Sequence, residues 1–487
     1  MFFRVTIPGG LVVPISSVTI TGPNSGQASV TVVAPSTLGP GTHTGTISIV
    51  ACTTDINCSG PLLGGSPQTI AVTYTIAPTL QGDAVAPHVA SSATPGEVVL
   101  RGAGLAALTS VAFDGVAATG FTQLGATEIR ASYPVLSAGT HAVQLQNASG
   151  PVAFSGNLVV VDPAGYVGTA LAYPASPGNF RSLVYDAARQ AILVATDTRI
   201  LRYAFSGSVW STTPAQQAVT SLRDTVLSNN GATLLALTTD SLRELDPVTL
   251  VQIGMTNGPV SGPSQVPLNR LALANDGIAV VTAEQFDTYF YPTGSPSFFR
   301  AALSGASFFF GALPAASENR SLIAFIQGQL SPAPEVLKYV SSSGLLSAMS
   351  LHENRISVNI ADIDPAPSVD RSGTRVAFNS SVGDTGGGTH VYDESMTLLG
   401  ALPLSTQAVA FAPNPAGAAV RAYTLDGCKL RAFDLLTVNS GNFAEIVNAP
   451  YPITLGCPGN HPRIVMTPDG GNAILAGDTQ VVIVQTP

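Results

Sequence analysis

A short polar turn between two apolar strands recurs seven times in the C-terminal part of this chain. The turns comprise Asp186–Arg189, Asn229–Gly231, Asn275–Gly277, Glu318–Arg320, Asp370–Gly373, Asn414–Gly417 and Asp469–Gly471. Most are rich in Asp, Asn and Gly, residues that favour tight turns. Successive turns lie roughly 43 to 55 residues apart, the length of a four-stranded propeller blade. The repeat therefore predicts a seven-bladed β-propeller over residues 163–487.

The strands around these turns also predict how the ring closes. An apolar strand follows each turn, as in Ile192–Ala195, and a third strand often comes next, as in Ile200–Ala204. The last repeat ends after Val481–Val484, one strand short. We expect Gly165–Tyr173, which precedes the first repeat, to supply the missing outer strand. Closure by both chain ends would leave no unpaired sheet edge there.

The composition favours many short strands over helices or a membrane span. Charged residues make up only 10% of the 487 residues, whereas there are 48 glycines and 36 prolines. Apolar residues occur in short runs that Gly, Pro, Asn and Asp interrupt, which is typical of strands and turns. No unbroken apolar run reaches the ~18 residues that a transmembrane helix needs. We therefore expect an all-β chain of several domains without a transmembrane segment.

The charge pattern argues against a nucleic-acid partner. The net charge is −9, Lys338 and Lys429 are the two lysines, and the arginines form no basic run. A protein that binds nucleic acid needs clustered basic residues to replace the counterions of the phosphates. We expect no nucleic acid among its partners.

The four cysteines form two sets that are each close in sequence, Cys52 with Cys58 and Cys428 with Cys457. Two even sets favour two disulfides and an oxidising compartment, so we expect a secreted, periplasmic or cell-surface protein. The alternative is four buried free thiols. Neither set has further ligands at the spacing of a zinc site. Met1–Val5 lacks the features of a signal peptide, so we expect either a removed signal or a truncated start.

Residues 1–79 carry only two charged side chains, Arg4 and Asp55. Strand-like stretches in this segment are Ser17–Thr21, Ala28–Val33, Gly41–Val50 and Gln68–Ile76. They are sufficient for a small β-sandwich. The pattern PGTHTGTISIVAC, followed by Cys58 and GSPQTIAVTYTI, resembles the immunoglobulin-like repeats of bacterial secreted and surface proteins. In that resemblance the two cysteines of the segment staple a loop at a strand end.

Residues 80–162 predict a second β-sandwich. Its ordered motifs are Pro95–Leu105, Val111–Gly115, Ile129–Pro134 and Ala138–Leu145. This order resembles the IPT/TIG domains, an immunoglobulin-like family of surface receptors and bacterial exoproteins. The resemblance implies a spacer or a module for protein contacts.

The propeller topology places both C-terminal cysteines on one face. In a propeller the second-to-third strand turns and the connections between blades share a face, and the first-to-second strand turns lie on the other. Cys428 follows the turn Asp426–Gly427 in the sixth blade, and Cys457 lies in the connection into the seventh. We therefore expect a disulfide between neighbouring blades.

The same face carries the candidate ligand residues. Carboxylates in its second-to-third strand turns are Asp197, Asp240, Asp384, Asp426 and Asp478, with Glu284 or Asp287 in the third blade. A ring of carboxylates at the channel mouth could hold Ca²⁺ or attract a cationic ligand. The alternative is that Asp serves as a turn residue that caps backbone N–H groups.

Nucleophilic catalysis has little support in the sequence. His390 could reach the acidic face, but the histidines are dispersed and no Gly-x-Ser-x-Gly elbow is present, so no Ser/His/Asp set can be assembled. The Gly-rich stretch Asp384–His390 lacks the Lys-Ser/Thr of a phosphate loop and reads as a loop on the ligand face. The single tryptophan, Trp210, reads as a packing residue rather than a sugar platform.

These observations favour a non-enzymatic binding or adhesion module outside the cell, with the immunoglobulin-like pair as a spacer. The propeller face that carries the cysteines would contact a protein or a glycan. Two alternatives stay open. The repeats also resemble lactonase-type propellers, which implies a hydrolase with a metal at the channel mouth. The low-charge N-terminal domain could instead pack between copies in a surface filament or assembly.

Overall fold

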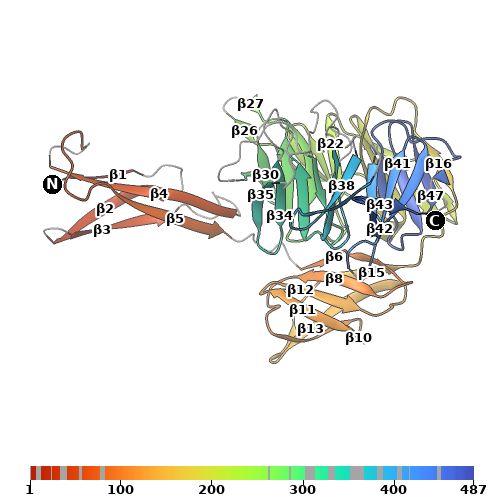
Figure 1. The fold of residues 1–487 in the computed structure, drawn as a ribbon, viewed down its shortest axis with the longest axis horizontal. Helices are drawn as coiled ribbons and strands as arrows, with labels where there is room; N and C mark the ends of the chain where they lie inside the picture. Colours follow the sequence, from red (N-terminus) through yellow and green to blue (C-terminus); the bar gives the residue numbers. More distant parts are fainter. Residues whose placement is uncertain are drawn as a thin grey trace. The chain divides into compact units, whose positions relative to one another are not determined.

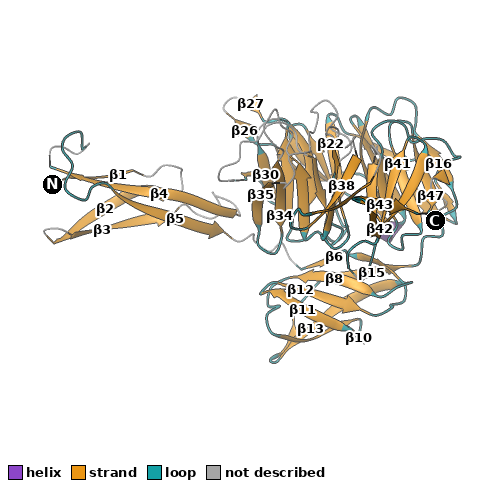
Figure 2. Cartoon of the chain, in the orientation of Figure 1, coloured by secondary structure: helices purple, strands orange, loops and turns teal. Residues whose placement is uncertain are grey.

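The computed structural model describes residues 2–6, 12–22, 25–32, 41–53, 58–76, 83–261, 264–284, 287–301, 313–326, 335–350, 367–380, 388–402, 408–415, 417–446 and 451–486. Within these residues the chain is all-β, and the one helical segment is the 3-10 turn η1 (Ala187–Arg189) (Figure 2). No helix in the described part has the length and apolar character to cross a lipid bilayer. The chain forms two compact units, residues 1–79 with 299–304 and residues 80–298 with 305–487.

The first unit contains two small antiparallel sheets. One has the order β1 (Phe2–Thr6), β4 (Gly41–Cys52) and β5 (Gln68–Ile76). The other pairs β2 (Val12–Gly22) with β3 (Ser25–Val32). Alternating Thr, Val and Ile residues explain the long strands, because β-branched side chains suit a pleated surface. The four strands expected from the sequence are therefore present. Short strand β31 (Phe299–Arg300) is grouped with this unit.

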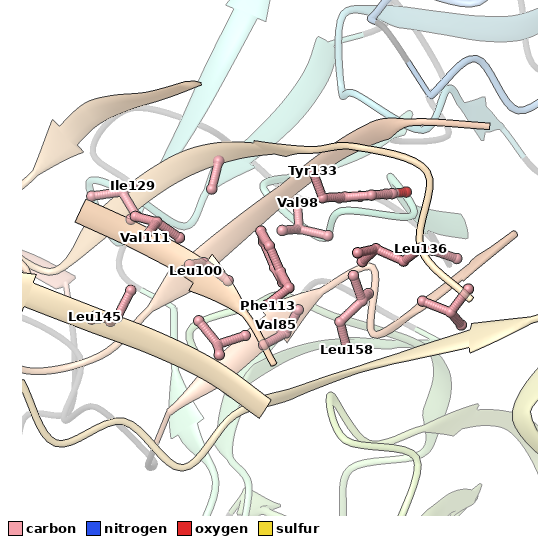
Figure 3. Close-up of a cluster of buried hydrophobic side chains, with 14 of the residues drawn as sticks. Val85, Val98, Leu100, Val111, Phe113, Ile129, Tyr133, Leu136, Leu145 and Leu158 are labelled. Atoms are coloured by element: carbon pink, nitrogen blue, oxygen red, sulfur yellow. The ribbon is translucent and has the colours of Figure 1, made fainter. Parts of the chain in front are cut away.

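The second unit begins with a β-sandwich. One sheet contains β11 (Gly120–Gly125), β12 (Glu128–Tyr133), β8 (Gly96–Arg101) and β6 (Ala84–Ala86), in that order. The other contains β10 (Val116–Ala117), β9 (Leu108–Phe113), β13 (Gly139–Asn147), β15 (Asn157–Val161) and β7 (Val89–Ser91), with β14 (Gly150–Val152) beside β13. Both sheets turn apolar side chains inward, and these form one core (Figure 3). The rings of Phe113 and Tyr133 meet edge to face at its centre, 5.8 Å apart.

The rest of the second unit consists of consecutive antiparallel sheets whose strands follow one another in sequence (Figure 1). Their innermost strands are β17 (Phe180–Asp186), β22 (Leu222–Leu227), β28 (Leu268–Leu273), β32 (Leu313–Ala316), β36 (Ser368–Val369), β40 (Ala408–Phe411) and β45 (Arg463–Met466). The second strands are β18 (Ala191–Thr196), β23 (Leu234–Thr238), β29 (Ile278–Ala283), β33 (Leu322–Ile326), β37 (Arg375–Ser380), β41 (Arg421–Asp426) and β46 (Asn472–Ala476). The third strands are β19 (Arg199–Ser206), β24 (Ser241–Leu245), β30 (Thr288–Pro292), β34 (Glu335–Val340), β38 (Gly388–Asp393), β42 (Lys429–Asn439) and β47 (Gln480–Gln485).

Outer strands complete most of these sheets. They are β21 (Ala215–Ala218), β25 (Gln252–Asn257), β35 (Leu345–Ser350), β39 (Leu398–Leu402), β43 (Asn442–Glu445) and β16 (Thr169–Ala172). Short additional strands are β20 (Val209–Trp210), β26 (Val260–Ser261), β27 (Ser264–Gln265) and β44 (Tyr451–Pro452). Each innermost strand contacts the next, and β45 contacts β17, so the sheets close into a ring. This ring around a central channel is a β-propeller.

The ring closes through the strand that the sequence predicted. β16 pairs with β47, with Thr169 opposite Ile483 and Ala172 opposite Gln480. Strands from the two ends of the propeller segment therefore share one sheet, which confirms that Gly165–Tyr173 supplies the outer strand. Leu171 of β16 is buried in the apolar cluster between the first and last sheets.

The second strands explain the apolar runs of the repeat. β18, β23, β29 and β46 are buried along their full lengths, because neighbouring sheets cover both of their faces. Strands covered on both faces read as continuous apolar runs rather than alternating ones. Trp210 is also buried, with its ring centroid 4.9 Å from that of Tyr166 and 5.1 Å from that of Phe205. It is a packing residue, as predicted.

The closing strand should determine the stability of the ring. Leu171→Ala should lower the free energy of unfolding by about 2 to 4 kcal/mol, the usual cost of a cavity in a packed core. Ala170→Ser changes an exposed neighbour on the same strand and should have little effect. Denaturant unfolding of both variants tests this expectation, and equal effects would contradict a closing role for the buried face of β16.

Candidate ligand face and channel of the propeller

Because neighbouring strands in each sheet run in opposite directions, the two faces of the propeller are formed by different sets of loops. The turns between first and second strands lie on one face, which we call the turn face. The turns between second and third strands and the connections between sheets lie on the other, which we call the disulfide face. The strand pairings place each of the seven turns of the repeat between an innermost strand and its second strand.

The predicted disulfides are both present. Cys428, in the turn between β41 and β42, is bonded to Cys457, which lies between β44 and β45. This bond joins neighbouring sheets on the disulfide face. In the first unit, Cys52 at the end of β4 is bonded to Cys58. The prediction of two local disulfides is confirmed, and with it the alignment of the last two repeats.

Two of the predicted carboxylates come together at the start of β17. Asp197 accepts hydrogen bonds from the backbone N and the side-chain Nδ2 of Asn179, at 2.9 and 2.7 Å. Asp478, from the last sheet, accepts one from the backbone N of Phe180 at 3.2 Å. The Nδ1 atom of the exposed His461 lies 3.3 Å from Asp478. Asp478 therefore ties the last sheet to the first, whereas Asp197 holds Asn179 within the first repeat.

The other predicted residues have local partners. Asp240 accepts hydrogen bonds from the hydroxyls of Thr238 (2.7 Å) and Ser241 (3.1 Å), and these hold the pKa of its carboxyl below the usual range. Asp426 forms an ion pair with Arg431 at 2.9 Å. Asp384 lies outside the described residues. His390 lies within β38, with its ring 6.4 Å from that of Tyr392.

The described carboxylates accept hydrogen bonds from backbone and hydroxyl groups and form ion pairs. In the part of the chain that the structure describes, no group of three His, Cys, Asp or Glu side chains has the geometry to hold a metal ion. A ligand role for these carboxylates stays a prediction.

A charged layer that sequence reasoning missed lies near the start of the innermost strands. The carboxylate of Asp224 accepts the backbone N–H of Leu271 at 3.1 Å, and the guanidinium of Arg270 donates to the carbonyl of Arg223. Burial raises the pKa of Asp224, and the charges of Arg270 and Arg463 oppose that rise. In the ring β17 separates β45, which carries Arg463, from β22, which carries Asp224. These residues, with the ion pair Arg223–Glu284, form the charged layer.

A sequence signal for this layer does exist. An arginine recurs near the start of several innermost strands, at Arg181, Arg223, Arg270 and Arg463. The arginines are far apart in sequence and form no basic run, so a search for clusters along the chain does not find them. The ring brings them to one level of the channel.

The second sandwich covers the opposite end of the channel, at the turn face. Tyr133 of the sandwich accepts a hydrogen bond from Arg371 at 3.5 Å, and β15 contacts η1 of the first sheet. His88 lies against Gly231, where a Cβ atom would be only 2.7 Å from its Nε2 atom. Gly231 has a φ of +66°, so glycine suits this turn both for its backbone and for the space it leaves.

Buried charged groups of the sandwich and of the third sheet influence one another electrostatically. Arg101 and Glu128 form a buried ion pair at 2.5 Å inside the sandwich. The buried Asp276, in the propeller turn beside them, accepts a hydrogen bond from the hydroxyl of Tyr339. Burial raises the pKa of Asp276 to about 6, although the charge of Arg101 acts in the opposite direction. Burial also raises the pKa of Glu128.

The connection between sandwich and ring is itself anchored. The backbone N of Ala164 donates to Asp469 at 3.1 Å, and the side chain of Asn472 donates to the carbonyl of Tyr166 at 3.0 Å. The hydroxyl groups of Tyr166 and Tyr185 are 2.7 Å apart. The connection is therefore part of the packed structure rather than a free linker.

Comparisons with known proteins identify no family. No protein-family model matches the chain, and no curated protein matches it in sequence. Solved structures with a similar arrangement include the Mitotic Checkpoint Complex (11% identity, 67% of this chain and 96% of that chain, TM-score 0.47). They also include the β-propeller domain of Myceliophteria thermophila Cps50 (Swd1) (10% identity, 65% and 99%, TM-score 0.46). A third is the extracellular domain of a putative hybrid two-component system from B. thetaiotaomicron (12% identity, 66% and 40%, TM-score 0.44). At these TM-scores, the assignment of a β-propeller rests on the strand topology above.

The raised pKa of Asp276 predicts a pH-dependent stability. The folded state holds this proton up to about pH 6, whereas an unfolded Asp releases it near pH 4, so stability should fall as the pH rises between these values. Asp276→Asn mimics the protonated form. The free energy of unfolding of this variant should therefore fall by on the order of 2 to 3 kcal/mol less than that of the wild type over this pH range.

Denaturant unfolding of both proteins from pH 3.5 to 8 measures the difference. The Asn variant should be the more stable protein above pH 6. The pKa of Asp246, in an exposed turn, is lowered by backbone hydrogen bonds from Thr249 and Val248. Asp246→Asn should therefore be less stable than the wild type at neutral pH, which is the opposite of the effect expected for Asp276→Asn. If the free energies of unfolding of wild type and Asp276→Asn changed with pH in the same way, the raised pKa of Asp276 would be contradicted.

Proposed function

We propose that the chain is an extracellular, non-enzymatic module that binds a protein partner. In this proposal residues 1–79 form an immunoglobulin-like sandwich and residues 80–162 a sandwich of the IPT/TIG kind. Residues 163–487 form a seven-bladed propeller. The two disulfides support an oxidising compartment, because such bonds rarely persist in a reducing cytosol.

The arrangement of the second unit supports the disulfide face as the face that binds. The sandwich occupies the turn face, where Arg371, His88 and η1 are in contact across the two parts. A partner that uses a propeller face would therefore meet the turns and connections of the disulfide face. The described carboxylates there already have hydrogen-bond or ion-pair partners, which supports a role in holding the surface in shape.

The observation that carries the proposal is a row of exposed aliphatic side chains that leads to this face. Ile253 and Met255 on the outer strand β25 are 61% and 53% exposed, and Val260 in the following hairpin is 69% exposed. The end of this row is held at the disulfide face, since the backbone N of Gly258 donates to the carbonyl of Asp240 at 2.6 Å. Adjacent exposed aliphatic residues on an outer strand are typical of protein contacts.

Removing the aliphatic row should weaken binding. The purified, fluorescently labelled chain should bind saturably to the surface of intact cells that produce it. The triple variant Ile253→Thr, Met255→Thr, Val260→Thr places a β-branched residue that suits a strand at each position, and its binding should fall by about tenfold, because apolar anchors dominate protein interfaces. A flow-cytometric titration measures both curves.

A matched control lies on the second sandwich, where Val116, Leu124 and Val135 are also exposed aliphatic residues. Their replacement by Thr should leave binding unchanged. Protease treatment of the cells should abolish binding, and glycosidase treatment should not. Binding that survives proteolysis, or equal losses for the two triple variants, would contradict the proposal.

A further inference from the structure

The channel contains a chamber between the sandwich and the inner wall of the ring. Its volume is about 340 Å³, at the small end of the range for ligand sites. The sandwich forms its floor with Val85–Val89. Apolar residues from several innermost strands form much of its wall, among them Val226, Leu271 and Val465. The charged layer lies next to this wall. Asp224 and Arg270 each directly precede, in sequence, a residue that lines the chamber.

One guanidinium at the chamber has no carboxylate partner. Arg320 lines the chamber, and its Nη1 and Nη2 atoms donate to the Oδ1 atom of Asn229 (2.6 Å) and the carbonyl of Leu227 (2.8 Å). Both acceptors are neutral, and among the described residues no carboxylate forms an ion pair with Arg320. Burial lowers its pKa to about 10, so it stays charged at neutral pH. Arg320 is partly buried, and a cation that loses water contacts without gaining a counter-charge is costly unless something else supplies the negative charge.

The other charges at the chamber are balanced. Asp186 forms an ion pair with Arg189 at 2.8 Å, and Glu318 lies 3.6 Å from Arg371. His88 also lines the chamber. Burial, reinforced by the charges of Arg320 and Arg189, lowers the pKa of His88 to about 3, so its ring is neutral. The chamber therefore has one net positive charge, which is that of Arg320.

The Nε2 atom of His88 is buried and has no hydrogen-bond partner among the described residues. The neutral ring can donate or accept at this atom, depending on its tautomer. The Nε2 atom lies against Gly231, so the features that the chamber offers a ligand are an apolar wall and one guanidinium without a carboxylate partner. This is the composition of a site for a small molecule that is apolar over most of its surface and acidic at one end.

We propose that the chamber binds a small organic monocarboxylate, with its carboxylate on Arg320 and its hydrocarbon part against the wall of Val226, Leu271 and Val465. This site is separate from the protein-binding surface on the disulfide face. The carboxylate would complete the charge balance of the chamber with a charge-assisted hydrogen bond. The apolar part would displace water from the wall.

Calorimetric titration of the full chain with hexanoate and with hexanamide tests the proposal. The two probes have the same length and nearly the same shape, and they differ in charge. Hexanoate should bind at least about tenfold more tightly than hexanamide, because a charged acceptor makes the stronger hydrogen bond. Saturating hexanoate should also raise the midpoint of thermal unfolding. Equal affinities, no binding of either probe, or an equal response to sodium chloride alone would overturn the proposal.

Two variants locate the site. Arg320→Gln should remove the preference for the acid over the amide. The control is Arg199→Gln, which should retain that preference, because Arg199 donates to Gln216 outside the chamber. Since Arg320 also connects two sheets, a second variant avoids it. Ala316→Leu fills the chamber and should abolish binding of both probes in a protein that folds normally by circular dichroism. Unchanged binding by Ala316→Leu would place the ligand elsewhere and overturn the proposal.

Discussion

The pairing of β16 with β47 is the constraint on which the ring depends. Every sheet of the propeller packs both of its faces against neighbours, so no sheet is buried until the ring is complete. The pairing of residues 169–172 of β16 with β47 closes the ring, and it joins strands from the two ends of the propeller segment. Closure removes an exposed sheet edge and leaves the second strands covered on both faces. Asp478 of the last sheet reinforces the same junction by accepting a hydrogen bond from the backbone N of Phe180.

The second sandwich covers only one of the two faces of the ring. Its contacts at Tyr133, His88 and β15 cover the turn face, so the two ends of the channel become chemically different. One end carries neutral and apolar groups of the sandwich, and the other carries the charged layer with Arg270 and Asp224. The buried Asp276 and Arg101 lie at the junction itself, which makes the stability of the junction sensitive to protonation. The second sandwich thus also shapes the interior of the neighbouring ring.

Much of the fold could be predicted because it follows from local patterns. The turn at Asp469–Gly471 and the apolar strand after it needed only the chemistry of Asp and Gly and the periodicity of the chain. The Cys428–Cys457 bond followed from counting strands between turns. The charged layer was missed because its members are tens to hundreds of residues apart, and only ring closure brings Arg463 to Asp224. The chamber was missed for the same reason, since the pairing state of Arg320 depends on residues of a different sheet.

By itself the sequence determined the secondary structure, the repeat, the closing strand and the two disulfides, because each depends on residue type and spacing along the chain. It also identified Asp197 and Asp240 as turn carboxylates, and the structure adds their hydrogen-bond partners, Asn179 and Thr238. Only the tertiary structure decided which carboxylates and guanidinium groups face one another. Burial and distance across the channel set those pairings, and neither quantity is a property of sequence order. That is why Arg320 reads as one more turn residue in the sequence and as an uncompensated charge in the folded chain.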